Sequence, residues 1–79
     1  MTRIFKQGNY SVYVYDERGA QHSSPHAHIK ERGRQVCSIH LSTLEPLQPQ
    51  KEVPRGLRPE LEARQDEMIE AWERLNGDE

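Results

Sequence analysis

Residues 26 to 40 read HAHIKERGRQVCSIH, in which two short runs of strand-forming residues flank a single glycine. This pattern predicts a β-hairpin with strands at 26 to 31 and 35 to 41, joined by the loop Arg32-Gly33-Arg34. The hairpin decides the fold, because its register determines which side chains a neighbouring layer can bury.

We expect Glu31 to pair with Gln35 around this three-residue loop, because that register collects the apolar side chains on one face. The apolar face then holds Ala27, Ile29, Cys37 and Ile39, while the opposite face pairs His26 with His40 and His28 with Ser38. A two-residue loop would instead scatter polar residues onto both faces. Gly33 in the middle of the loop argues against this register, since the left-handed position is normally the last.

One strand and one loop precede the hairpin. The stretch SVYVYD at 11 to 16 is rich in β-branched and aromatic residues and alternates Val12 and Val14 with serine and tyrosines, as a two-faced strand does. The stretch ERGAQHSSP at 17 to 25 predicts a loop, in which Pro25 sets an extended entry into the next strand.

A proline-rich segment and a helix follow the hairpin. The stretch STLEPLQPQKEVP at 42 to 54 contains three of the five prolines and predicts an extended strap with a short edge strand at 43 to 47. A helix is expected over 59 to 76, because Pro59 suits the first helical position. Its apolar stripe consists of Leu61, Met68, Ile69, Trp72 and Leu75.

These elements predict an α+β fold, a small antiparallel sheet of three to four strands with one C-terminal helix packed on one face. The chain, 1 to 79, is expected to form a single domain with the sheet region at 10 to 47, the proline-rich strap at 48 to 58 and the helix at 59 to 76. The histidine-bearing face is then exposed to water, a ligand or a partner.

Composition limits the classes of function. With 79 residues, of which 33% are apolar, the chain buries a thin core, so we expect a homo-oligomer or a small protein partner to complete it. The single cysteine excludes an intramolecular disulfide. No apolar run is long enough for a signal peptide or a membrane span, which indicates a soluble cytoplasmic protein.

Charge is divided unevenly along the chain. Residues 1 to 58 carry nine Lys or Arg against five Asp or Glu, whereas residues 59 to 79 carry two against eight. The basic part can attract phosphates or an acidic partner, or it can be neutralised by the protein's own acidic helix.

Two motifs resemble those of a known family. The stretch HSSPHAHI at 22 to 29 resembles the His-x-x-Pro-His-x-His motif of the small bacterial proteins called the domain of unknown function 4160 family, and MIEAWERL at 68 to 75 resembles their closing helix. Family members commonly have a second proline and an aromatic where this chain has Ser24 and Ala27, and a tryptophan near Glu60. The resemblance implies one component of a toxin-antitoxin-like two-gene system that acts by binding a small protein partner.

The candidate metal ligands are His22, His26, His28 and His40. On one strand, His26 and His28 project to the same face with about 6.6 Å between their Cα atoms, from where two imidazoles can converge on one ion. His22 from the loop or His40 from the paired strand would complete a three-histidine site for zinc, nickel or iron, as in a metal-dependent hydrolase. A carboxylate ligand would have to come from Asp16 or Glu17.

The same region can also cleave RNA without a metal, and the candidate catalytic residues are His26, His28, Arg32 and Arg34. One imidazole can take the proton of a ribose 2′-hydroxyl and another can protonate the leaving oxygen, while a nearby cation such as Lys30 stabilises the phosphorane. Tyr13 or Tyr15 can stack a base of single-stranded RNA.

Each of these residues also has an ordinary explanation as a turn, strand or surface residue. Two functional classes therefore stay open: an interaction module whose partner binding depends on the charged helix, and a small enzyme, a ribonuclease or hydrolase, that depends on the histidines. Cys37, Met68 and Trp72 are expected to be core residues rather than parts of a site.

Overall fold

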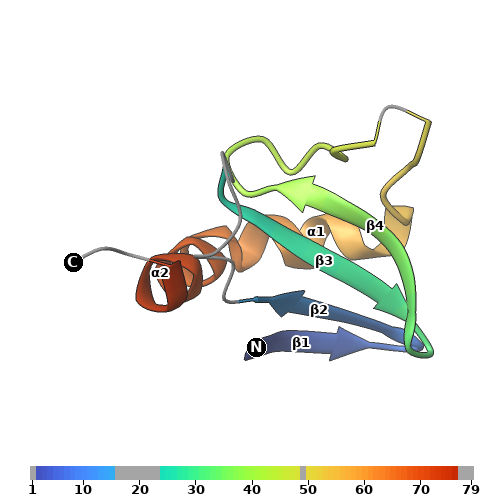
Figure 1. Cartoon of the computed structure of the whole chain (residues 1–79). Coiled ribbons are helices and arrows are strands. Elements are labelled where there is room, and N and C mark those ends of the chain that lie inside the picture. The colour runs from blue at the N-terminus through green and yellow to red at the C-terminus, as the bar shows by residue number, and fades with distance from the viewer. Residues whose placement is uncertain (1, 16–23, 49, 77–79) are drawn as a thin grey trace.

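The structure is a computed structural model that describes residues 2 to 15, 24 to 48 and 50 to 76. Its four antiparallel strands are adjacent in chain order, namely β1 (Thr2–Gln7), β2 (Tyr10–Val14), β3 (His26–Glu31) and β4 (Arg34–His40). A short 3-10 helix, η1 (Arg55–Leu57), leads into α1 (Arg58–Ala63) and α2 (Gln65–Asn76). The expected α+β fold with a C-terminal helix is confirmed (Figure 1).

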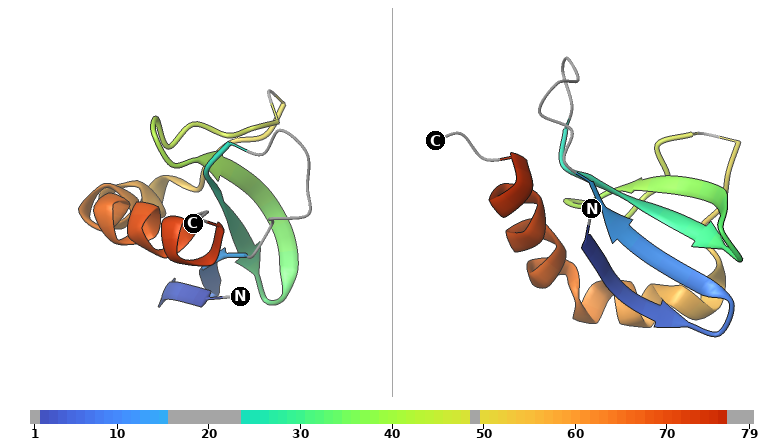
Figure 2. Two further views of the ribbon diagram at one scale, coloured as in Figure 1. Left: turned by 60° about the vertical axis from the view of Figure 1, so that its left-hand side comes forward. Right: turned by 60° about the horizontal axis from the view of Figure 1, so that its bottom comes forward.

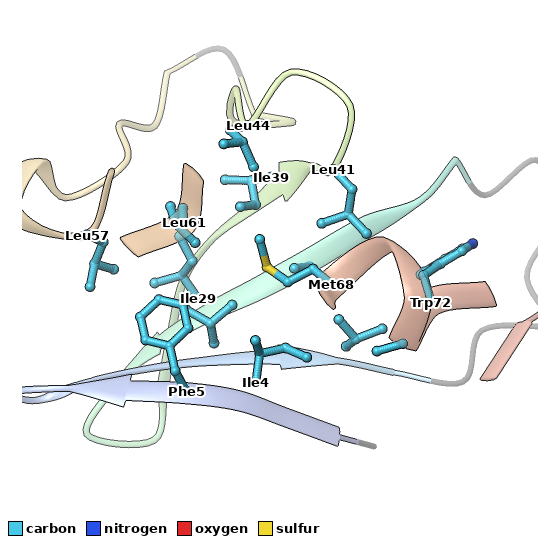
Figure 3. Packing of buried hydrophobic residues seen from close by; sticks show 14 of the residues in the cluster. Ile4, Phe5, Ile29, Ile39, Leu41, Leu44, Leu57, Leu61, Met68 and Trp72 are labelled. Carbon is cyan, nitrogen blue, oxygen red and sulfur yellow. The ribbon is translucent and has the colours of Figure 1, made fainter. Parts of the chain in front are cut away.

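Both helices lie against the same face of the sheet, as Figure 2 shows from two further directions. Figure 3 shows the core between these layers, to which the sheet contributes Ile29 and Ile39 and the helices contribute Leu61 and Met68. These four residues have no exposed surface. Since burying one such side chain stabilises the fold by about 1.5 to 3 kcal/mol, this contact holds the helices on the sheet.

The β3–β4 hairpin reverses through a two-residue loop, so the expected pairing of Glu31 with Gln35 is wrong. Arg32 and Gly33 have φ angles of 52° and 86°, the positive values that a type I′ turn requires at both central positions. Glu31 consequently pairs with Arg34.

A β-bulge then restores the expected faces. The register shifts between Ile29 and Lys30, which leaves Val36 as an extra residue in β4. Beyond the bulge the pairs are Ile29 with Cys37, His28 with Ser38, Ala27 with Ile39 and His26 with His40. The predicted division into an apolar face and a histidine-bearing face is confirmed, although a different loop produces it.

Strand β1 lies outside the sheet region that the sequence predicts. Its register against β2 shifts between Arg3 and Phe5, and the neighbouring Ile4 and Phe5 are both buried. This bulge removes the strict alternation of polar and apolar residues by which a strand is recognised in a sequence.

The predicted edge strand at 43 to 47 is reduced to an isolated bridge between Pro46 and Ile39. In this segment the backbone N–H of Leu47 donates to the carbonyl of Ser38 at 2.8 Å. The strap therefore runs along the outer edge of β4 and satisfies backbone groups there without forming a full fifth strand.

The predicted helix over 59 to 76 is interrupted at Arg64, whose φ and ψ are −109° and 13°. The Arg64 side chain donates hydrogen bonds to Glu60 and Glu67 on either side of the break, and its guanidinium lies 5.3 Å from the centre of the Phe5 ring. Of the predicted apolar stripe, Leu61, Met68 and Trp72 are buried, while Ile69 and Leu75 are partly buried. Among the described residues, neither helix is long and apolar enough to span a bilayer.

Gly33→Ala should lower the free energy of unfolding by about 1 kcal/mol, because a Cβ is disfavoured at its φ of 86°. Gly56→Ala is the matched control, since the atom nearest its added Cβ, Nε2 of Gln7, lies at an ordinary 3.8 Å. Urea unfolding followed by circular dichroism measures both. Equal stabilities of the two variants would contradict the type I′ turn.

Candidate functional site

The face of the sheet away from the helices carries most of the candidate residues, and we call it the outer face. Residues that pair across neighbouring antiparallel strands point to the same side, as Tyr13 and His28 do. The outer face comprises Arg3, Lys6, Ser11, Tyr13, Tyr15, His26, His28, Lys30, Gln35, Ser38 and His40. Figure 2 shows both helices on the opposite side.

Tyr15 lies at the centre of a group of rings on the outer face. Its ring centroid is 4.6 Å from that of His28 and 6.1 Å from that of Tyr13. The Lys30 ammonium lies 5.3 Å from the Tyr15 ring centre and 5.4 Å from that of Tyr13. These are the distances of aromatic and cation–π contacts. We call Tyr13, Tyr15, His28 and Lys30 the aromatic–cationic cluster.

His28 is held by two polar side chains of β4. Its Nδ1 lies 3.2 Å from Oγ of Ser38 and 3.3 Å from Nε2 of Gln35. An amide nitrogen can only donate, so Nδ1 of His28 accepts and the neutral ring carries its hydrogen on Nε2. Gln35 also donates to Oγ of Ser38 at 3.1 Å. The three side chains together fix the orientation of the His28 ring.

His26 is buried, so the expectation of an exposed histidine face is wrong at this position. Only 8% of the residue is exposed, and the ring of Trp72 near the end of α2 lies 5.0 Å away between centroids. Nδ1 of His26 donates to the carbonyl of Ser24 at 2.7 Å, which places the lone pair of the neutral ring on Nε2. The His26 and His28 centroids are 5.1 Å apart.

His40 is half-buried on β4 opposite His26. His22 lies outside the described residues, as do the alternative ligands Asp16 and Glu17. Within the part of the chain that the structure describes, no group of three or more His, Cys, Asp or Glu side chains could hold a metal ion. A metal site at the histidine motif therefore stays a prediction.

Arg32 and Arg34 are not brought to the histidine pair. Both are exposed at the turn between β3 and β4. Arg32 lies six residue steps beyond His26, and at about 3.3 Å for each step of an extended chain this is a distance of about 20 Å. Lys30 is instead the cation next to His28, because it lies two residues further along the same face.

Cys37 is a core residue, as expected, with 1% exposure on the face opposite to the histidines. Burial raises the pKa of its thiol above the ordinary value, while the positive charge of Lys51 acts in the opposite direction. The thiol is therefore protonated at neutral pH and packs as a small apolar side chain.

Two contributors to the site carry no signal in the sequence. Gln35 reaches His28 because the two-residue turn pairs Gln35 with Lys30, whereas the predicted loop paired it with Glu31. Trp72 belongs to the predicted core, yet its contact with His26 depends on how α2 docks on the sheet. Neither this turn nor this docking was predicted from the sequence.

Neither a family model, nor a curated protein, nor a solved structure matches this chain. The resemblance to the domain of unknown function 4160 family stays a prediction. The function therefore has to be argued from the outer face itself.

His26→Ala should destabilise the protein by about 2 kcal/mol, because it removes a buried ring from between Trp72 and His28. His28→Ala is the comparison, with a smaller cost of about 1 kcal/mol or less, since this ring is only half-buried. Thermal unfolding monitored through Trp72 measures both. A larger loss for His28→Ala would contradict the placement of the two rings.

Proposed function

We propose that the protein binds single-stranded RNA on the outer face of its sheet. The observation that carries this proposal is the aromatic–cationic cluster, in which Tyr15 lies against His28 and Lys30 lies over both tyrosine rings. Aromatic rings supply stacking surfaces for bases, and an ammonium beside them supplies a contact for a phosphate.

Charge on the outer face supports the same ligand. The described strand residues of this face include the cations Arg3, Lys6 and Lys30 and no carboxylate. The helices, which lie on the other side of the sheet (Figure 2), carry the exposed acidic residues Glu62, Asp66, Glu67, Glu70 and Glu73. A polyanion therefore meets an attractive surface on the sheet and a repulsive one on the helices.

The shape of the site favours unpaired bases over a duplex. A four-stranded sheet that presents aromatic side chains accommodates about two or three stacked bases. The rings of Tyr13 in β2 and of Tyr15, which follows the last residue of β2, are 6.1 Å apart. They belong to the surface of the sheet rather than to a projecting element that could enter a groove. Bases have to be unstacked to lie on such a surface.

Fluorescence anisotropy with a fluorescein-labelled 12-nucleotide single-stranded RNA tests the proposal. Tyr15→Ala should weaken binding about tenfold, since stacking on one aromatic side chain contributes about 1 to 3 kcal/mol. Tyr15→Phe should retain most of the affinity because it keeps the ring. Lys30→Ala should weaken binding and reduce its salt dependence, because it removes one phosphate contact.

Lys51→Ala is the matched control for Lys30→Ala, because Lys51 is an exposed lysine on the strap away from the cluster. Its affinity should stay within about twofold of the parent. Equal affinity of parent and Tyr15→Ala, or tighter binding of the duplex form of the same sequence, would contradict the proposed site.

A second candidate is the role that the family resemblance implies, the binding of a small protein partner in a toxin-antitoxin-like pair. The observation in its favour is the exposed acidic surface of α2, where Glu67, Glu70 and Glu73 lie within two turns. A basic partner would be recognised there without the outer face.

This second candidate predicts that Glu70→Lys combined with Glu73→Lys abolishes co-purification of the tagged protein with the small partner that such a two-gene system would encode. Tyr15→Ala and Lys30→Ala should leave that complex intact, because they lie on the other side of the sheet. Loss of the complex in the outer-face variants alone, with the helix variant unaffected, would contradict a partner on α2.

A further inference from the structure

We propose that RNA bound to the outer face runs across the strands from β1 to β3, with its phosphates over one row of side chains and its bases over the next row. This inference rests on the proposed RNA binding and assigns a path and two phosphate contacts to the same surface. The contacts are made by the ammonium groups of Lys6 and Lys30. The ligand is a single-stranded RNA with an extended backbone.

The pairing of the four strands arranges the outer face in rows perpendicular to the strands. Side chains that pair across neighbouring strands point to the same side and lie next to each other. The first row consists of Lys6, Ser11, Lys30 and Gln35. The second row, beside the first, consists of Arg3, Tyr13, His28 and Ser38. Each row therefore crosses the sheet from β1 to β4, the strands that form its two edges in Figure 1.

The two rows differ in chemistry in the way that the two ends of a nucleotide differ. The first row presents two ammonium groups, a hydroxyl and an amide, whereas the second row contains the rings of Tyr13 and His28, with Tyr15 beside them. The Lys30 ammonium lies 5.4 Å from the centre of the Tyr13 ring, so a phosphate bound there lies beside the stacking surface. A nucleotide carries its phosphate on one side of the sugar and its base on the other. The RNA backbone therefore follows the first row while the bases reach the second.

The bulge in β1 places Lys6 on the outer face. Residues three positions apart on a regular strand point to opposite faces, so Arg3 and Lys6 would be separated there. The register shift between Arg3 and Phe5 leaves Ile4 as an extra residue. Arg3 and Lys6 consequently both lie on the outer face and are exposed, while Ile4 and Phe5 are both buried. The same irregularity supplies apolar side chains to the core and a second cation to the first row.

The positions of the cations favour a path across the strands over a path along one strand. Lys6 and Lys30 are separated by β2 alone, which places their Cα atoms about 10 Å apart, and their flexible stems can reach neighbouring phosphates. Between them Ser11 presents a hydroxyl that can donate to a phosphate oxygen. Along β3, by contrast, Lys30 is followed on this face by His28 and then by His26, which is only 8% exposed. A backbone that followed β3 would meet no second lysine or arginine.

The salt dependence of binding by the full-length protein tests this path, measured by fluorescence anisotropy with a fluorescein-labelled 12-nucleotide single-stranded RNA. The logarithm of the association constant falls linearly with the logarithm of the salt concentration, with a slope of about −0.7 for each phosphate contact to a single strand. Lys6→Ala and Lys30→Ala should each weaken binding and reduce the magnitude of this slope by about 0.7. The double variant should reduce it by about 1.4, because the two contacts are separate.

Two further variants are the controls. Lys6→Arg keeps the positive charge and should keep the slope of the parent protein. Lys51→Ala removes a lysine of the strap that is as exposed as Lys6 but lies outside both rows, and it should leave the slope unchanged. Since the side chains of Lys6 and Lys51 are both exposed, neither substitution disturbs the core.

The outcomes separate this inference from the function on which it rests. A slope reduced by Lys6→Ala and by Lys30→Ala but not by Lys51→Ala supports the path. An unchanged slope in Lys6→Ala together with a reduced slope in Lys30→Ala would overturn the path and leave RNA binding standing, because the backbone would not reach β1. An equal reduction in Lys51→Ala would also overturn it, since the loss of any positive charge would then be enough. Absence of RNA binding by the parent protein would overturn both proposals.

Discussion

The division of the sheet into two chemically different faces depends on one extra residue in β4. With the tight turn at Arg32 and Gly33 alone, continuous pairing would place Cys37 opposite His28 and move Ser38 toward the core. The bulge at Val36 shifts the pairing by one residue and pairs Cys37 with Ile29 instead. An apolar surface for the helices and a polar outer face are thus consequences of the same local irregularity.

The sequence predicts most of the architecture but only part of the site. Strong alternation identified β2, and helical periodicity placed Leu61, Met68 and Trp72 in the core, where they are found. Strand β1 escaped prediction because its bulge lets neighbouring Ile4 and Phe5 both face the core. The burial of apolar residues on one face was enough to predict which residues of β4 lie opposite the histidines. The predicted three-residue loop was wrong and the bulge was not predicted, but these two errors shift the register in opposite directions and therefore cancel.

The burial of His26 could not be predicted because it depends on the end of α2 rather than on the strand. Trp72 reaches the histidine ring, and four residues later Nδ2 of Asn76 donates to the carbonyl of Tyr15 at 3.0 Å. The last turns of α2 therefore contact both strands that carry the rings of the outer face. The docking of α2 and the geometry of the candidate site are therefore coupled. A substitution that shifts α2 also shifts the rings of the site, even where the substituted residue does not contact them.

The bulge in β1 has a consequence for how copies of this protein behave at high concentration. An edge strand with regularly spaced unpaired backbone groups is a template for intermolecular sheet growth and amyloid. Here the bulge distorts the free edge between the exposed, charged Arg3 and the buried Phe5, while the strap occupies the edge of β4. The two edges are blocked by different means, and ordered aggregation through added strands is disfavoured at both.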